Sequence, residues 1–289
     1  MRNTIKDNIT FRKLKNNLFH GLILGATLLC IVVLSILILD ILYKGLGWIS
    51  FKFLLSFPSR IPKNSGILPG LIGSAYIIGL TILMAVPVGV GCALYLEEYA
   101  KDNFFTRMVK LNISNLSGTP SIVYGLLGLS VFVRTLGFGR SIISGALTMS
   151  LVILPIVIVS AEEALKAVPQ FLRHGSFALG ATRWQTIQKI VLPTALPGIM
   201  TGIILAVSRA LGESAPLIMV GAASFITFLP HNPLSGFTAL PLQIYDWTGR
   251  PQADFQKVAA AGIIVLLTLL ISFNATAILL RNKYQNKVY

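Results

Sequence analysis

Charged residues are scarce in this sequence. Of its 289 residues, 12% are Asp, Glu, Lys or Arg and 54% are hydrophobic, whereas a soluble domain has about 25% charged residues. So few charges cannot cover the surface of a soluble globule of this length. Several apolar runs also exceed the roughly 20 residues that cross a bilayer as a helix. A soluble enzyme, a nucleic-acid-binding module and a disordered tail are therefore excluded.

Motifs for catalysis and nucleotide binding are also missing. The sequence contains no G-x-x-x-x-G-K-[ST] loop and no Gly-Lys dipeptide, so it cannot hold a nucleotide phosphate in the P-loop manner. His20, His174 and His231 are scattered and form no H-E-x-x-H pair, which leaves a zinc hydrolase unsupported. Residues 212–216 only partly resemble the G-x-S-x-G elbow of serine hydrolases, because the last position is proline. We expect no catalytic residue, metal site or cofactor in this chain, so uphill transport would need a partner or an ion gradient.

Six long apolar runs account for the hydrophobic excess. We interpret each as a helix, because backbone groups in hydrocarbon need internal partners and the runs are too long for barrel strands. The first run follows basic residues but is about twice as long as a signal-peptide core and lacks an A-x-A site, so we expect an uncleaved span. The sequence thus predicts an all-α polytopic membrane protein with six transmembrane helices. The expected spans are residues 18–43, 67–96, 113–133, 141–161, 194–222 and 258–280.

The distribution of Lys and Arg predicts the orientation. The two terminal tails and segments 97–110 and 162–193 together carry 15 of these residues. Segments 44–66, 134–140 and 223–257 together carry 8. Basic residues favour the cytoplasmic side of a membrane protein. We therefore expect both termini and segments 97–110 and 162–193 in the cytoplasm. The net charge of +14 therefore reflects topology and does not indicate a nucleic-acid partner.

Arg209 and Glu213 are the only ionisable residues deep within an apolar run. On one continuous helix their i, i+4 spacing places both side chains on one face, where they can pair. An arginine at mid-bilayer costs roughly 2.5–3.5 kcal/mol, so the pair is expected to face the bundle interior or a water-filled path. Two interpretations remain open: a latch between helices, or a substrate site on a polar pathway. Asn274, in the last run, is expected to form an interhelical hydrogen bond.

The segment between the fourth and fifth runs predicts a short amphipathic helix, a glycine and a second helical stretch. Phe177, Trp184 and Ile187 would be its apolar contacts. A helix with aromatic side chains outside the membrane is expected to lie on the bilayer surface or to fit a groove on another protein.

Residues 174–193 resemble the EAA loop of bacterial ABC importer permeases, E-A-A-x(3)-G-x(9)-I-x-L-P. We call this segment the EAA-type loop. It matches the pattern at Gly180, Ile190, Leu192 and Pro193, whereas His174 replaces the glutamate of the triplet. The resemblance implies that this loop couples to a separate ATP-binding subunit, which agrees with the missing P-loop. The coupling residues that it implies are His174, Gly180, Ala181, Trp184, Ile190, Leu192 and Pro193.

Four further segments resemble phosphate importer permeases, more the PstA type than the PstC type. They occur in the family's order, and the resemblance covers about residues 66–281. It implies a type I ABC importer permease: residues 1–65 as tail, first span and external loop, 66–281 as permease core, and 282–289 as cytoplasmic tail. The four segments are 87–100, 118–125, 208–216 and 240–245.

The resemblance also implies function and partners. It indicates an inorganic phosphate importer of the bacterial cytoplasmic membrane, with Arg209 and Glu213 on the substrate path. The implied partners are a dimer of a PstB-like ATP-binding subunit, a PstC-like permease, an external phosphate-binding protein and membrane lipid, without nucleic acid. Two alternatives remain: a permease for another solute such as molybdate, and an ion channel or gradient-driven transporter without an ATPase.

Overall fold

The computed structural model describes residues 2–223 and 225–285. These residues form helices and turns without any strand, which confirms the all-α prediction. Three π-helical turns extend α3, extend α5 and precede α9. The α-helices are α1 (Arg2–Gly45), α2 (Phe51–Leu55), α3 (Leu68–Leu94), α4 (Phe104–Ser117), α5 (Ser121–Gly128), α6 (Ile142–Lys166), α7 (Gln170–Ala178), α8 (Arg183–Thr186), α9 (Leu192–Gly212), α10 (Ala215–Val220), α11 (Leu240–Thr248) and α12 (Ala253–Gln285).

Five of the six predicted spans correspond to long apolar helices, in α1, α3, α6, α9 and α12. The third does not. Residues 113–133 were expected as one helix, but α4 and the α5 segment meet at 101°. Pro120, with φ −55° and ψ 131°, lies between them, and a proline disfavours helical backbone in the residue before it. The described residues therefore contain six candidate spans only if this bent pair counts as one.

The fifth predicted span, 194–222, is also shorter than expected. Helix α9 ends at Gly212, and Glu213 leaves the helix with extended backbone angles of −80° and 124°. The short α10 then begins with Pro216 in its first turn, where a missing N–H and a fixed φ are tolerated. The chain changes direction next to the charged pair.

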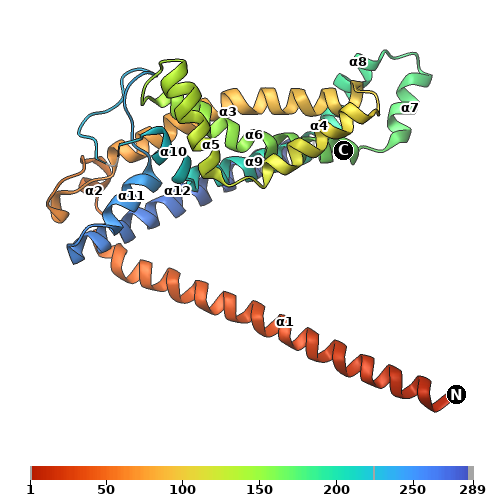
Figure 1. The fold of residues 1–289 in the computed structure, drawn as a ribbon, viewed down its shortest axis with the longest axis horizontal. Helices are drawn as coiled ribbons and strands as arrows, with labels where there is room; N and C mark the ends of the chain where they lie inside the picture. Colours follow the sequence, from red (N-terminus) through yellow and green to blue (C-terminus); the bar gives the residue numbers. More distant parts are fainter. Residues whose placement is uncertain (1, 224, 286–289) are drawn as a thin grey trace.

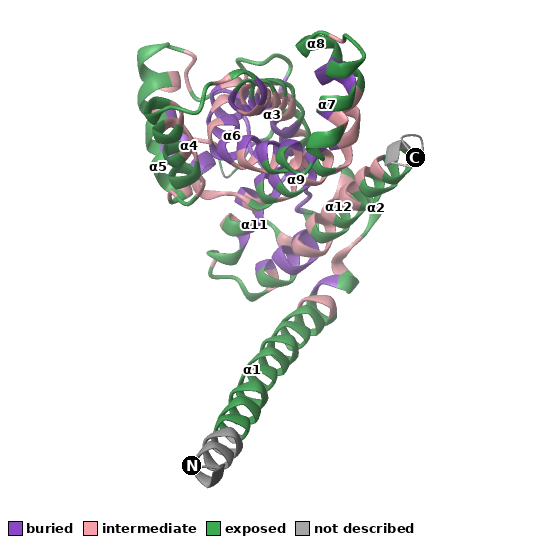
Figure 2. Cartoon of the chain, turned by 90° about the vertical axis from the view of Figure 1, so that its right-hand side faces the viewer, coloured by how far each residue is buried: buried purple, intermediate pink, exposed green. Residues whose placement is uncertain are grey.

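Helices α3, α6 and α9 form the centre of the bundle. In α6, 67% of the apolar window is buried, against 0% in α1, and Figure 2 shows the buried residues gathered on these central helices. Small residues allow α9 to approach α6 closely. A Cβ on Gly198 would lie 2.8 Å from the Cβ of Ala164, and one on Gly202 would overlap Ser160. The spacing of these two glycines therefore serves ordinary close packing.

Helix α1 extends away from the bundle (Figure 1). The last turn of α1 contacts α12, where Gly45 packs against the backbone of Ala260 and Ala261. Its side chains from Lys15 to Leu39 are exposed and mostly apolar. A helix that is apolar all round suits lipid or a neighbouring subunit rather than water.

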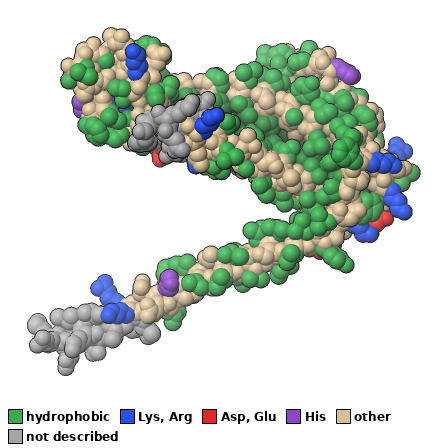
Figure 3. Space-filling view, turned by 180° about the vertical axis from the view of Figure 1, so that it is seen from behind, with side chains coloured by type: hydrophobic (Ala, Val, Ile, Leu, Met, Phe, Trp, Pro, Cys, Tyr) green, Lys and Arg blue, Asp and Glu red, His purple; other side chains and the backbone are tan. Residues whose placement is uncertain are grey.

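The two ends of the bundle differ in what they carry. Figure 1 places α7, α8, the end of α12 and the start of α1 toward one end, and α2 and α11 toward the other. On the face drawn in Figure 3, hydrophobic side chains cover the middle and charged side chains gather toward the ends. The EAA-type loop and the end of α12 thus lie toward the same end of the bundle; that this end and both termini are cytoplasmic stays a prediction.

Candidate functional site

Arg209 lies in the last turn of α9, and Glu213 follows the end of this helix. The expectation that both share one continuous helix was wrong, because α9 stops between them at Gly212. The two side chains still pair, with Arg209 Nε donating to Glu213 Oε1 at 3.3 Å. The Arg209 side chain is 45% exposed and that of Glu213 is 19% exposed. Within this chain alone, Arg209 therefore faces outward rather than into the bundle interior.

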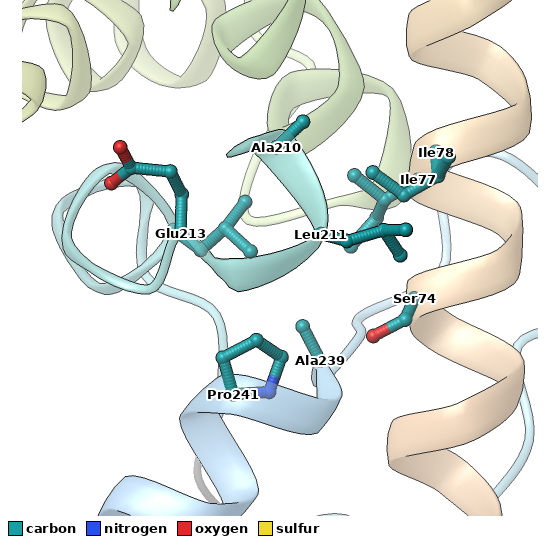
Figure 4. A pocket seen from close by; sticks show the side chains of 9 residues that line it. Ser74, Ile77, Ile78, Ala210, Leu211, Glu213, Ala239 and Pro241 are labelled. Carbon is teal, nitrogen blue, oxygen red and sulfur yellow. The ribbon is translucent and has the colours of Figure 1, made fainter. Parts of the chain in front are cut away.

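The break after α9 borders a small apolar cavity between α3, α9 and α11. Its volume is about 10 Å³, which leaves room for one water at most. In Figure 4, Leu211 and Ile77 face each other across it, whereas the carboxylate of Glu213 points away from Ser74 and Pro241. We conclude that this side of the break is closed packing and that the charge of Glu213 belongs to the opposite side.

Arg209 instead lines an open groove of about 600 Å³ along α6 and α9, which we call the polar furrow. Its polar and charged members come from α4, α6 and α9, and its walls are otherwise small or apolar. A small hydrated anion fits this volume; among the described residues its lining carries one cation, Arg209, and one carboxylate, Glu163. The furrow is lined by Ser117, Ile156, Val159, Ser160, Glu163, Gly198, Thr201, Gly202, Leu205 and Arg209.

A second groove of about 420 Å³ shares Val159 and Glu163 with the polar furrow. It continues along α6 toward α7 and is lined by Arg107, Lys110 and Lys166 among others. The two grooves therefore adjoin along α6. The second groove is also lined by Glu162, which pairs with both Lys110 and Lys166 at 2.7 Å.

Polar contacts fix the neighbouring helices beside the polar furrow. Ser208 Oγ donates to Asn274 Oδ1 at 2.6 Å and so joins α9 to α12, which confirms the interhelical hydrogen bond predicted for Asn274. Arg281 Nη1 donates to Thr201 Oγ1 at 3.1 Å and makes a second link between the same helices. These contacts hold α9, and with it Arg209, in a defined position.

The EAA-type loop has the predicted helix–glycine–helix structure. Helix α7 ends at Ala178, and Gly180 follows with a φ of +80°, a conformation that favours glycine. Helix α8 begins with a capping box in which Thr182 accepts from the N–H of Gln185 and the Gln185 side chain accepts from the N–H of Thr182. Such a box satisfies two backbone donors at the helix start. The local fold is thus built by residues of the loop itself.

The loop presents some of its predicted contact residues and buries others. Trp184 is 59% exposed and Phe177 is 45% exposed. Ile187 was expected among these contacts, but it is buried, so that expectation was wrong. It lies in the π-turn before α9, and this turn packs against α7. His174 is exposed and lines a groove of about 220 Å³ beside α7.

The remaining residues of the pattern lie within the loop backbone or at the entry to α9. Ala181 donates its N–H to the carbonyl of Ser176 at 3.2 Å. Ile190 is half-buried in the π-turn, and Leu192 and Pro193 form the first turn of α9. In this chain these positions shape the connection between loop and span.

A buried ion pair that the sequence did not reveal joins α7, the helix that leads into this loop, to the π-turn after α3. Arg173 of α7 donates through Nε and Nη2 to Glu98 Oε1 at 3.2 and 2.8 Å, and both side chains are at most 10% exposed. Nearby, the guanidinium of Arg183 lies 5.3 Å from the ring centre of Tyr99, within the range of a cation–π contact. Glu98 and Tyr99 lie in the π-turn after α3. The segment 87–100 had been noted for its resemblance, but nothing in it indicated a partner 75 residues away.

Comparisons with known proteins agree with this architecture. The family model "binding-protein-dependent transport system inner membrane component" matches residues 85–283. "Probable ABC transporter permease protein YqgI" of Bacillus subtilis is 34% identical over 278 residues, covering 92% of this chain and 95% of that protein. "Phosphate transport system permease protein PstA 1" of Mycobacterium tuberculosis is 32% identical, covering 93% of this chain and 90% of that protein.

Solved structures share the fold at low sequence identity. A chain of a bacterial alginate ABC transporter, crystallised with an alginate pentasaccharide-bound periplasmic protein, has a TM-score of 0.66 and 15% identity, covering 90% of this chain and 92% of that one. An inward-facing MetNI methionine ABC transporter chain has a TM-score of 0.57 and 16% identity, covering 75% of this chain and 97% of that one. The helical order, the EAA-type loop and these matches agree: the chain belongs to the binding-protein-dependent transport system inner membrane component family and is a multi-pass permease subunit of an ABC importer.

Proposed function

We propose that this permease carries inorganic phosphate, in the manner of PstA-type subunits. The observation that carries the proposal is the position of Arg209, paired with Glu213 and lining the polar furrow. The relatives named as phosphate transport permeases support it, since they align over most of the chain. The relative YqgI, whose name specifies no solute, leaves the substrate to be tested.

The chemistry of Arg209 suits this cargo. Phosphate is an anion near neutral pH, and an anion that crosses a medium of low dielectric constant needs a cation close by. A guanidinium offers a planar set of donors that matches phosphate oxygens. Glu213 occupies one Arg209 donor at rest and offsets its charge until phosphate arrives.

The open polar furrow suggests a two-subunit path. Arg209 is exposed in this chain, and an exposed arginine in a bilayer is costly unless water or a second protein covers it. A PstC-like permease would close the furrow from the other side. An external phosphate-binding protein would deliver the anion to the end of the bundle that carries α2 and α11.

The EAA-type loop would couple ATP binding and hydrolysis on a separate subunit to transport. Two copies of a PstB-like ATP-binding subunit would bind the two permeases, with Trp184 and Phe177 as the exposed aromatic contacts on this chain. Aromatic side chains of this kind are frequent binding hot spots. ATP binding would close the ATPase dimer and switch the path between outward and inward access. The proposal places this chain in the bacterial cytoplasmic membrane with both termini and the loop in the cytoplasm, and assigns it no cofactor.

Uptake of radiolabelled phosphate by cells with and without this chain tests the proposal. We expect ATP-dependent uptake that arsenate reduces and that sulfate and molybdate leave unchanged. Uptake of molybdate instead of phosphate would identify a permease for another solute. Uptake that continues without the ATP-binding subunit would point to a gradient-driven transporter.

A further inference from the structure

The Arg173 guanidinium joins three separate parts of the chain. Besides its two hydrogen bonds to Glu98, Nη1 donates to the carbonyl of Val168 at 2.6 Å and Nη2 donates to that of Leu165 at 2.9 Å. Leu165 belongs to the last turn of α6 and Val168 to the connection before α7. One side chain of α7 therefore holds the π-turn of α3 and the end of α6 together.

These contacts matter because of how the chain is connected. Helices α6 and α9 continue directly into the α7–α8 segment, so a movement of that segment reaches them through the backbone. Helix α3 has no such connection and meets the segment only in space. The Glu98–Arg173 pair and the Arg183–Tyr99 contact are the polar links between them among the described residues.

We infer that Glu98 and Arg173 are positioning residues that transmit the movement of the EAA-type loop to α3. The inference rests on the proposed role of this loop in coupling to an ATPase, but not on phosphate as the cargo. Charge-assisted hydrogen bonds are directional and short, so they fix the register between α7 and the π-turn. An apolar contact of the same size would hold the surfaces together but allow them to slide. Helix α3 lines the cavity at the break after α9, so its movement reaches the region of Glu213.

The test uses the complete transporter in proteoliposomes with its external binding protein, and measures cargo transported per ATP hydrolysed. The variants are Arg173→Gln, Glu98→Gln and the apolar double variant Glu98→Leu with Arg173→Met. Replacing a buried ion pair by apolar side chains often leaves stability unchanged, whereas removing one partner strands a charge. The double variant therefore separates loss of the link from loss of folding.

We expect each variant to lose at least about fivefold in cargo per ATP, the lower end of measured coupling between sites, while ATP hydrolysis continues. Restoration of the wild-type ratio in the apolar double variant would contradict the inference and leave the pair as a stabilising contact. Lys44→Gln is the matched control. Lys44 of α1 pairs with Asp40 at 2.7 Å, but this pair is 46% and 49% exposed. The control should keep the wild-type ratio.

A distance measurement tests the same inference without depending on phosphate. Spin labels on cysteines at Lys101 and Gly175, both exposed, report the separation of the end of α3 from α7 once the two native cysteines are replaced by serine. In the wild type the distribution of distances between the two labels should stay unchanged when ATP binds. In Arg173→Gln this distribution should broaden. A wild-type distance that changes with ATP would overturn the inference. Absence of phosphate transport with a constant distance would refute the proposed cargo and retain the link.

Discussion

Gly180 is the position where a small substitution has the clearest expected effect on the EAA-type loop. Its φ of +80° lies in the left-handed region, and a Cβ there would have nothing within 4 Å. Gly175, within α7, is equally free of neighbours but does not have a positive φ. A substitution at either position therefore meets no steric clash, and the two differ in backbone conformation.

The magnitudes follow from that difference. Alanine in the left-handed region costs about 1–2 kcal/mol, which lowers the population of the formed turn by a factor of about 5–30. Gly175→Ala should instead stabilise α7 by up to about 1 kcal/mol, because alanine is the better helix former. Gly180→Pro is more severe. It imposes a φ of about −65° and removes the N–H that donates to the carbonyl of Phe177 at 2.9 Å.

Hydrogen exchange of the loop amides, co-purification with the ATP-binding subunit and transport measure the outcome together. We expect faster exchange around residues 178–182 in Gly180→Ala and no such change in Gly175→Ala. Gly180→Pro should abolish transport while the chain still inserts into the membrane. Normal ATPase association and normal uptake in Gly180→Pro would refute this reasoning and indicate a loop that only lies on the membrane surface.

Three further predictions concern the charged pair, the exposed tryptophan and the topology. Arg209→Ala should abolish phosphate uptake, and Arg209→Lys should keep part of it, because lysine retains the charge without the planar guanidinium. Full uptake by the double variant Arg209→Glu with Glu213→Arg would instead identify the pair as a latch between helices. Trp184→Ala should weaken ATPase association by about 2 kcal/mol or more, as for an interface hot spot, and an unchanged dissociation constant would exclude Trp184 from that interface. A cysteine at Leu234, which is 61% exposed, should react with an impermeant thiol reagent on intact cells and one at Lys101 should not; the reverse pattern would invert the orientation.

The sequence predicted the spans better than their breaks. Hydropathy reports how long a stretch remains apolar, and it correctly located α1, α3, α6 and α12. It does not report direction, so the bend at Pro120 and the end of α9 at Gly212 were missed. At each break the chain forms a local turn: the Thr119 N–H donates to the carbonyl of Leu116 at 3.0 Å, and the Glu213 N–H donates to that of Ala210 at 3.3 Å. The local signals were present, since a proline lies at or shortly after each break.

The candidate site was predictable where it depended on local spacing. The glycine and capping residues of the EAA-type loop specify its turn within a few positions, and Asn274 was recognised as a polar group that needs a helix partner. The Glu98–Arg173 pair was not predictable, because its partners are brought together by the packing of α3 against α6 and α7. The exposure of Arg209 was likewise not predictable, because hydropathy does not report which side of α9 other helices cover.

Transport by the purified complex in vesicles tests the central claim most directly. This chain, its partner permease and the ATP-binding subunit are reconstituted with the external binding protein, and the initial uptake rates of phosphate and molybdate are compared with and without ATP. We predict phosphate uptake that requires ATP and is lost in Arg209→Ala, with no uptake of molybdate. Phosphate uptake without ATP, or molybdate uptake in place of phosphate, would contradict the account.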